Sequence, residues 1–138
     1  MWRGLLIAML LAGCVQLPPR PQDMQAKRFE AVPGKAVIYL VRNNPDVSKL
    51  VATVKLDGVV MGSSYPGTYF RWEVSPGQHW IAGYASDTGE ISLVTDAGKI
   101  YYVRQNVVNK NTPQSMFQVV SELDGRMIAI RGELARTQ

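Results

Sequence analysis

Residues 68–74 read Thr-Tyr-Phe-Arg-Trp-Glu-Val, with a large apolar side chain at every second position. This alternation is typical of a half-buried β-strand, because successive side chains point to opposite faces of a sheet. The residues predicted to point inward are Phe70, Trp72 and Val74. The residues predicted to point outward are Tyr69, Arg71 and Glu73. We therefore expect Trp72 to be a core residue.

Segments with strand-like composition recur about every ten residues on both sides of this stretch, separated by turn residues. They cover residues 36–41, 50–56, 78–84, 99–107 and 116–120. The first of them is apolar at odd and even positions alike, as in a strand that is covered on both faces. Asp57-Gly58 predicts a hairpin, because a type I′ turn needs positive φ. This spacing is typical of a β-sandwich or barrel, and we expect an antiparallel β-sandwich of about seven or eight strands.

The C-terminal segment has a different pattern. Residues 121–124 (Ser-Glu-Leu-Asp) resemble a capping box, which predicts the start of a short C-terminal helix. Spacings of four, three and four would place the following apolar residues on one helix face: Leu123, Met127, Ile130 and Leu134. Gly125 and Gly132 disfavour a helix, and an edge strand over residues 127–130 is the alternative.

The N-terminus has the layout of an export signal, with Arg3, an apolar run over residues 4–11 and small residues at 12 and 13. The run is too short to span a bilayer. Residues 11–14 (Leu-Ala-Gly-Cys) resemble the lipobox of bacterial lipoproteins. The resemblance implies cleavage after residue 13 and acylation of Cys14, on its sulfur and its new amino terminus, by fatty acids such as palmitate. An ordinary secretory signal is the alternative, although the only cysteine of the chain stands where lipidation requires one.

Two further features of this region bear on location and domain boundaries. Val15 stands where an aspartate would signal retention in the inner membrane, so the resemblance implies the inner leaflet of the outer membrane, facing the periplasm. Residues 14–34 contain four prolines and predict a semi-rigid tether, with a short helix over 23–30 possible but not required. The predicted organisation is a signal peptide over residues 1–13, a tether over 14–34 and a β-sandwich domain over 35–138.

The composition excludes several kinds of site. One cysteine and one histidine leave no basis for a disulfide framework or a Cys/His zinc site, and we expect no metal and no cofactor. The net charge of +4, without a basic run, gives no indication of nucleic-acid binding. His79 is the only imidazole for a catalytic triad, and we interpret it as a packed strand residue, so we expect no enzyme activity. The remaining carboxylates are expected to be solvated surface charges: Glu73, Asp87, Glu90 and Asp96.

Five short motifs between residues 34 and 104 carry a family resemblance. They lie at residues 34–39, 54–58, 67–70, 75–79 and 97–104, and include Pro-Gly-x-His and Ala-Gly-Lys-x-Tyr-Tyr. Together they resemble a bacterial lipoprotein family whose soluble part is a domain of unknown function, similar to small β-sandwiches of the PEGA and transthyretin-like type. The resemblance covers roughly residues 36–131. It implies an Ig-like or transthyretin-like sandwich that acts as an accessory or interaction module, and it transfers no catalytic residue.

An aromatic and cationic surface is the candidate binding face. We expect it to comprise Tyr69, Arg71, Tyr101 and Arg104, because tyrosine and arginine are common at interfaces. Cross-strand pairs that only stabilise the sheet are the alternative interpretation. The sequence thus predicts a non-catalytic, membrane-anchored envelope lipoprotein that binds a protein partner. A module that binds peptidoglycan or another glycan is the alternative.

Overall fold

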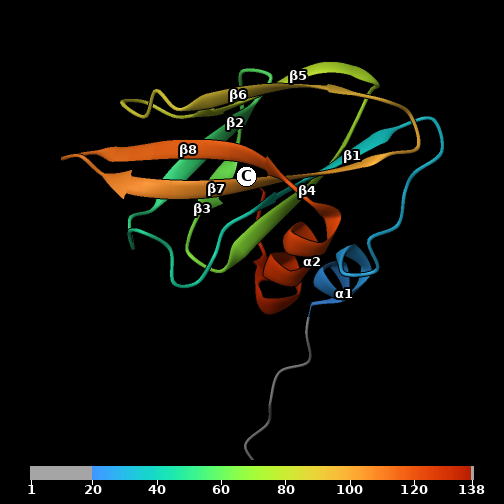
Figure 1. Ribbon diagram of the computed structural model, residues 1–138, viewed down its shortest axis with the longest axis horizontal. Helices are drawn as coiled ribbons and strands as arrows, with labels where there is room; N and C mark the ends of the chain where they lie inside the picture. Colours follow the sequence, from blue (N-terminus) through green and yellow to red (C-terminus); the bar gives the residue numbers. More distant parts are fainter. Residues whose placement is uncertain (1–19, 138) are drawn as a thin grey trace, which may run out of the picture.

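The computed structural model describes residues 20–137, which form two packed β-sheets and two short helices (Figure 1). The strand orders are β8-β7-β1-β4-β9 in the first sheet and β3-β2-β5-β6 in the second. The strands are β1 (Ala36–Val41), β2 (Ala52–Leu56), β3 (Val59–Ser64), β4 (Thr68–Val74), β5 (Gly77–Gly83), β6 (Glu90–Thr95), β7 (Ile100–Asn109), β8 (Pro113–Val120) and β9 (Glu133–Leu134). The helices are α1 (Pro21–Ala26) and α2 (Glu122–Arg131). Across the described residues the protein is therefore mainly β, with nine strands in a sandwich-like arrangement.

The main hydrophobic core lies between the two sheets. The alternation in β4 correctly predicted its inward residues, since Phe70, Trp72 and Val74 all belong to this core. Trp72 is 4% exposed, which confirms it as a core residue. From the second sheet, Val54 of β2 and Ile81 of β5 meet these side chains. The core thus forms where the inward-pointing apolar side chains of one sheet meet those of the other.

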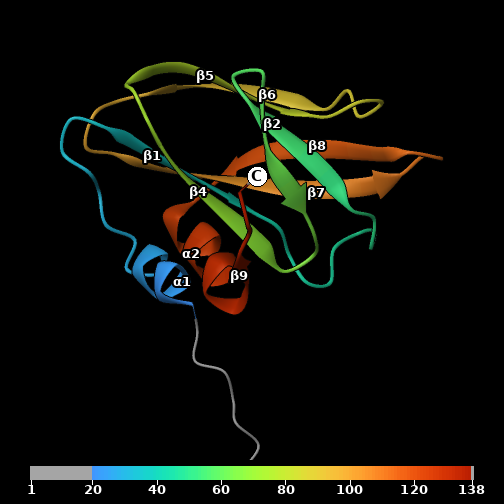
Figure 2. The same cartoon turned by 180° about the vertical axis from the view of Figure 1, so that it is seen from behind.

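Strand β1 is buried on both faces, as its continuous apolar sequence predicted. All six of its residues are buried. Ile38 and Leu40 point into the main core, whereas Val37, Tyr39 and Val41 point into a second cluster beneath the helices. Figure 2 shows α1 and α2 beside the sheet that contains β1 and β4.

Most strand pairs are antiparallel, but two are parallel. The Asp57-Gly58 turn joins β2 and β3 as predicted, with φ values of 51° and 81°. In contrast, β1 pairs in parallel with β7, and β4 pairs in parallel with β9, so the expectation of a wholly antiparallel sandwich is wrong at these two pairs. Their strands are far apart in sequence, and no hairpin turn fixes their relative direction.

Part of the segment expected to be a tether packs against the sheets, on the N-terminal side of the expected domain start at Lys35. Helix α1 begins at Pro21, which suits a first helical position because its missing N–H would be unpaired there anyway. Ala26 and Phe29 are buried against the second cluster. The proline-rich composition therefore marks a helix start within this segment, where the sequence suggested an extended tether.

Helix α2 confirms the predicted capping box but not the predicted face. The Ser121 hydroxyl accepts a hydrogen bond from the Asp124 N–H at 3.2 Å, so this segment is a helix and not an edge strand. Leu123 and Ile130 are nevertheless 69% and 57% exposed, whereas Gly125 and Ala129 are buried. A methyl group at Gly125 would overlap the Tyr102 ring of β7. The helix lies so close to the sheet that only small residues fit between them.

Candidate functional site

The helices close an aromatic cluster on the outer face of the first sheet. The Tyr39 ring lies 5.3 Å from both Phe29 and Tyr102, and 6.2 Å from Tyr69, measured between ring centroids. The hydroxyl groups find protein partners: Tyr39 donates to the Ala26 carbonyl at 2.6 Å. This cluster is a satisfied interior, and it holds the helices on the sheet.

A buried carboxylate fastens α1 to two strands. One oxygen of Asp23 accepts hydrogen bonds from the Tyr69 hydroxyl at 2.7 Å and from the Leu134 N–H at 2.9 Å. The other oxygen lies 3.0 Å from the Lys27 ammonium. Burial raises the pKa of Asp23, but these three interactions outweigh it, and the pKa lies below its usual range. The charged form of Asp23 therefore stabilises the attachment of α1.

The four residues predicted as a binding face do not form one exposed surface. Tyr69 is fully buried beneath the helices. Tyr101 lies on the other face of the same sheet, where it packs against the main core. Arg71 pairs with Glu73 at 2.9 Å, and Arg104 donates to the Gln118 side chain at 2.8 Å. Alternation separates the two faces of a strand, but it does not tell which face other elements cover. The prediction that Tyr69 is exposed is wrong for this reason.

His79 lies between two hydrogen-bond acceptors, an arrangement that favours its doubly protonated form. Its Nδ1 lies 2.6 Å from an Asp57 carboxylate oxygen, and its Nε2 lies 2.6 Å from the Ser75 carbonyl oxygen. Because both neighbours are acceptors, both ring nitrogens must donate. Burial lowers the pKa of His79, but the two hydrogen bonds outweigh it and raise the pKa above its usual range. The ring has no free lone pair, so in this state it serves as a structural cation between a turn and a strand.

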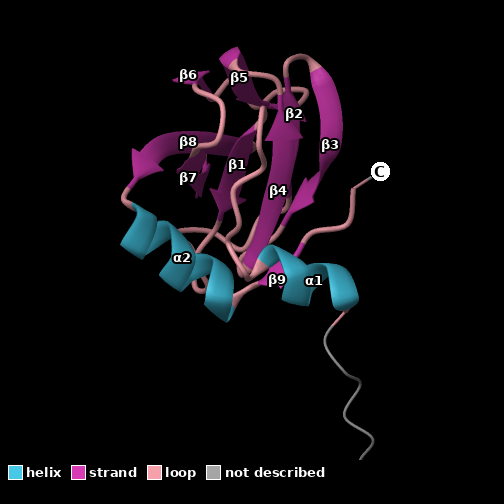
Figure 3. Ribbon diagram, turned by 90° about the vertical axis from the view of Figure 1, so that its right-hand side faces the viewer, coloured by secondary structure: helices cyan, strands magenta, loops and turns pink. Residues whose placement is uncertain are grey.

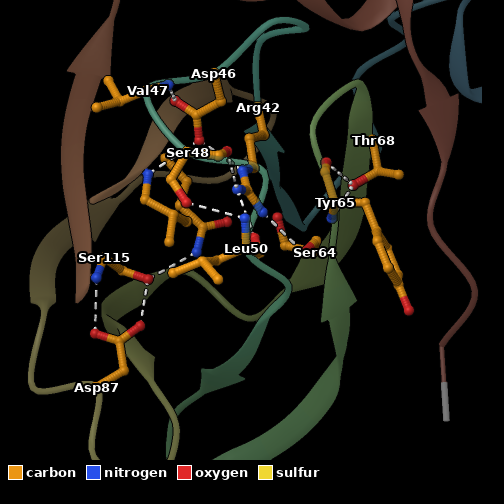
Figure 4. Close-up of polar contacts among 12 residues, drawn as sticks. Arg42, Asp46, Val47, Ser48, Leu50, Ser64, Tyr65, Thr68, Asp87 and Ser115 are labelled. Carbon is orange, nitrogen blue, oxygen red and sulfur yellow. Dashed lines mark hydrogen bonds and ion pairs between the residues drawn. The ribbon is translucent and has the colours of Figure 1, made fainter. Parts of the chain in front are cut away.

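A buried ion pair organises the loop between β1 and β2 (Figure 4). Arg42 Nε donates to Asp46 at 2.7 Å, and the two side chains are each 1% exposed. The Arg42 guanidinium also donates to the carbonyl groups of Ser48, Leu50 and Ser64. The Asp46 carboxylate in turn accepts hydrogen bonds from the N–H groups of Val47 and Val107, so the pair binds loop and strand backbone and has a structural role.

A second polar cluster joins the two sheets. The Asp87 carboxylate accepts hydrogen bonds from both the hydroxyl and the N–H of Ser115, and Figure 4 shows this pair. Gln105 in turn donates to the Ser115 hydroxyl at 2.9 Å. Asp87 is only 7% exposed, which corrects the expectation of a solvated surface charge. The reason is that the turn before β6 folds against β8.

No element between residues 20 and 137 covers the outer face of the second sheet, which carries aromatic side chains. Trp80 and Tyr84 are each 48% exposed, and Val94 is 70% exposed. Trp80 points outward because Ile81, its neighbour in β5, points into the main core. The Lys55 ammonium of β2 lies 5.2 Å from the centre of the Tyr84 ring. We call Lys55, Trp80, Tyr84 and Val94 the aromatic sheet face.

The sequence contained a signal for this surface. Residues 78–84 alternate in the same way as residues 68–74, and their outward parity contains Trp80 and Tyr84. The binding face was expected instead on the outward side of residues 68–74, where α1 covers Tyr69. Figure 3 shows both helices on the side of the molecule away from β5 and β6. The aromatic sheet face therefore stays open and is the candidate functional site.

Between residues 20 and 137 there is no group of three His, Cys, Asp or Glu side chains arranged to hold a metal ion. In the same part of the chain, no helix has the length and apolar character needed to cross a membrane. Cys14, the predicted lipidation site, lies outside the described residues.

Comparisons with known proteins give a family but no activity. Residues 33–118 match the model of the family described as "Protein of unknown function (DUF2846)". An uncharacterized protein of Haemophilus influenzae is 25% identical over 103 residues, which make up 72% of this chain. The matched region spans 61% of the length of that relative. No solved structure matches this chain.

Proposed function

This chain belongs to the DUF2846 family of proteins of unknown function, and from its geometry we propose a non-catalytic bacterial envelope lipoprotein that acts as an accessory or interaction module. In this proposal Cys14 carries the lipid anchor, at the inner leaflet of the outer membrane, and the domain faces the periplasm. The aromatic sheet face binds an envelope protein. The proposal also relates the sandwich to small accessory domains of the PEGA and transthyretin-like type.

One observation carries the proposal: the two outer faces of the sandwich differ. Helices cover the first sheet, and the chain leaves this side at Arg20, six residues after Cys14. The second sheet exposes Trp80, Tyr84 and Val94. An anchor on one side and an open apolar face on the other suit a domain that is held at a membrane and presents a surface to a partner.

The residue types on the aromatic sheet face support protein binding. Tryptophan and tyrosine are enriched among the residues that contribute most to interface affinity, because they bury a large apolar area with few rotatable bonds. Exposed apolar groups that lie together on a soluble domain are common at interaction sites. Lys55 beside Tyr84 adds a charged rim to this apolar centre.

The state of the buried polar groups supports a non-catalytic role. Both nitrogens of His79 are engaged, and the carboxylates of Asp46 and Asp87 accept hydrogen bonds from backbone and side-chain donors. General acid–base catalysis needs a group that can reach a substrate proton. These three groups are instead directed at other parts of the fold.

A glycan is the alternative ligand, favoured by the arrangement of the two rings. Trp80 lies in β5, and Tyr84 directly follows the last residue of this strand. Aromatic rings with a polar tip offer flat surfaces for the apolar faces of sugars. A peptidoglycan-binding module would use these rings as two consecutive stacking positions.

The test is in-cell crosslinking of the full-length chain, followed by identification of the adducts. The double substitution Trp80→Ala, Tyr84→Ala should remove the adducts, because losing two anchor residues costs at least about 2 kcal/mol, or about 30-fold in affinity. The matched control is Val59→Ala, Met116→Ala, which alters exposed apolar residues elsewhere and should leave the adducts unchanged. Undiminished adducts in the Trp80 and Tyr84 variant would reject the proposed face. Cosedimentation of wild type with isolated cell wall, lost in the same variant, would favour the glycan.

A further inference from the structure

Helix α2 exposes a stripe of large apolar side chains. Leu123, Met127 and Ile130 are 69%, 43% and 57% exposed. Their spacing of four and three residues places them on one side of the helix, opposite Gly125 and Ala129, which face the sheet. Packing within this domain does not explain why large apolar residues occupy the solvent side of a helix.

The stripe continues onto α1. Met24 of α1 is 57% exposed, and it lines the same open groove as Ile130. This groove has a volume of about 1370 Å³ and runs between α1, the end of α2 and the residues that follow α2. We call Met24, Leu123, Met127 and Ile130 the helix-layer face. It is an apolar surface formed by two helices on one side of the molecule.

The position of the chain upstream of α1 indicates what covers this face. Arg20 lines the groove, and its guanidinium donates a hydrogen bond to the Leu134 carbonyl, so this point of the chain is fixed beside the helix-layer face. Cys14 lies only six residues before Arg20. Six residues span at most about 20 Å when fully extended. A lipid anchor at Cys14 therefore keeps Arg20, beside the Met24 and Ile130 end of the helix-layer face, within that distance of the bilayer surface.

The charges around the face are compatible with lipid headgroups. Exposed arginines flank the apolar residues, at Arg20 and Arg28 beside α1 and at Arg131 at the end of α2. Helices that lie in a membrane interface combine an apolar face with basic residues at its border, because the long side chains reach the phosphates while the apolar groups enter the acyl boundary. The helix layer has this composition at α1 and at the end of α2, where the arginines lie, whereas the acidic Glu122 and Asp124 flank Leu123 in the first turn of α2.

We propose that the helix-layer face is a lipid-docking surface, which rests flat on the membrane to which the domain is anchored. This inference rests on the proposed function, since the anchor at Cys14 brings the face to the bilayer. It goes further by fixing the orientation of the domain. The helix layer lies against the lipid, and the aromatic sheet face points away from it into the periplasm.

Fluorescence quenching by brominated lipids tests this orientation. The full-length chain, purified in its acylated form, carries an environment-sensitive fluorophore on a new thiol at Met127→Cys or, separately, Leu123→Cys. Both chains are reconstituted in vesicles of phosphatidylethanolamine and phosphatidylglycerol. The matched control is Val94→Cys, an exposed apolar position on the aromatic sheet face. We expect quenching at 127 and 123 to be several-fold stronger than at 94.

The other outcomes separate the two proposals. A Cys14 that mass spectrometry finds unacylated overturns the proposed function and the inference together. An acylated chain with equal quenching at 127, 123 and 94 overturns the inference alone. Labels at 127 and 123 that are shielded from a water-soluble quencher but not quenched by brominated lipid also overturn it. That result would mean that a partner protein or a second copy of this chain covers the helix-layer face.

Discussion

His79 is an example of a residue whose role depends on its neighbours more than on its chemistry. In the sequence it is the only imidazole and therefore the only candidate for a catalytic base. In the fold, Asp57 and the Ser75 carbonyl bind its two nitrogens, and Asp57 also accepts the Trp80 N–H at 2.8 Å. The pair fixes the β2–β3 turn beside β5. Trp80 of the aromatic sheet face thus takes its backbone position partly from this ion pair.

The ion pair between His79 and Asp57 makes the free energy of unfolding dependent on pH. The pKa of His79 is raised in the folded state, so its contribution is complete below the usual value of 6.5 and is lost as the pH rises through the folded pKa. Burial raises the pKa of Asp57, but the hydrogen bonds from His79 and Trp80 outweigh this effect, so the pKa lies below its usual value. Its contribution is therefore lost only in acid. We predict that the unfolding free energy declines between a pH near the usual value of 6.5 and a pH above the raised pKa of His79.

The control for this prediction is Asp57→Asn, which removes the anionic partner of His79. In this variant the decline between the same two pH values should be smaller, because His79 no longer gains from the charged form. Denaturant unfolding at each pH measures the effect. An identical decline in wild type and Asp57→Asn would show that another group causes the dependence.

Helix α2 shows the limit of apolar periodicity as a guide to packing. The spacing of Leu123, Met127 and Ile130 correctly indicated one face of a helix, but this face is exposed. The buried face consists of Gly125 and Ala129, which a hydrophobicity pattern does not register as core residues. Close approach to Tyr102, and not apolar content, decides which face meets the sheet.

We predict that Gly125→Ala destabilises the domain. Alanine favours an isolated helix over glycine by up to about 1 kcal/mol, but here its methyl group would overlap the Tyr102 ring. Overpacking of this kind costs about 1–3 kcal/mol, so the net free energy of unfolding should fall. Leu123→Ala is the matched control on the exposed face and should change it by no more than about 0.5 kcal/mol. Thermal or denaturant unfolding distinguishes the two, and a stabilised Gly125→Ala variant would contradict this packing.

The strands were more predictable than the surfaces they present. Alternation in residues 68–74 and the Asp57-Gly58 turn are local signals, and both hold in the structure. The coverage of Tyr69 depends on α1, whose position is set by a hydrogen bond between residues 46 positions apart. Such a contact leaves no periodic trace in the sequence. The candidate site was missed because burial by distant segments decides which outward strand face stays open.

At the scale of the whole molecule, the two outer faces of the sandwich have different roles in our proposal. The helix layer with its apolar residues lies beside Arg20, the first described residue, and the aromatic sheet face lies on the second sheet. A rigid sandwich between them transmits the orientation set at the membrane to the binding face. The proposed anchor at Cys14 is the premise that joins these parts into one function.

The most direct test is the mass of the peptide that contains Cys14, taken from the full-length chain after expression in a bacterial envelope. The account predicts a peptide that begins at Cys14 and carries a diacylglyceryl group on sulfur and a fatty acyl group on its amino terminus. In a Cys14→Ser variant this modified peptide should be absent. A wild-type peptide that continues from residues 12 and 13 into an unmodified Cys14 would contradict the account.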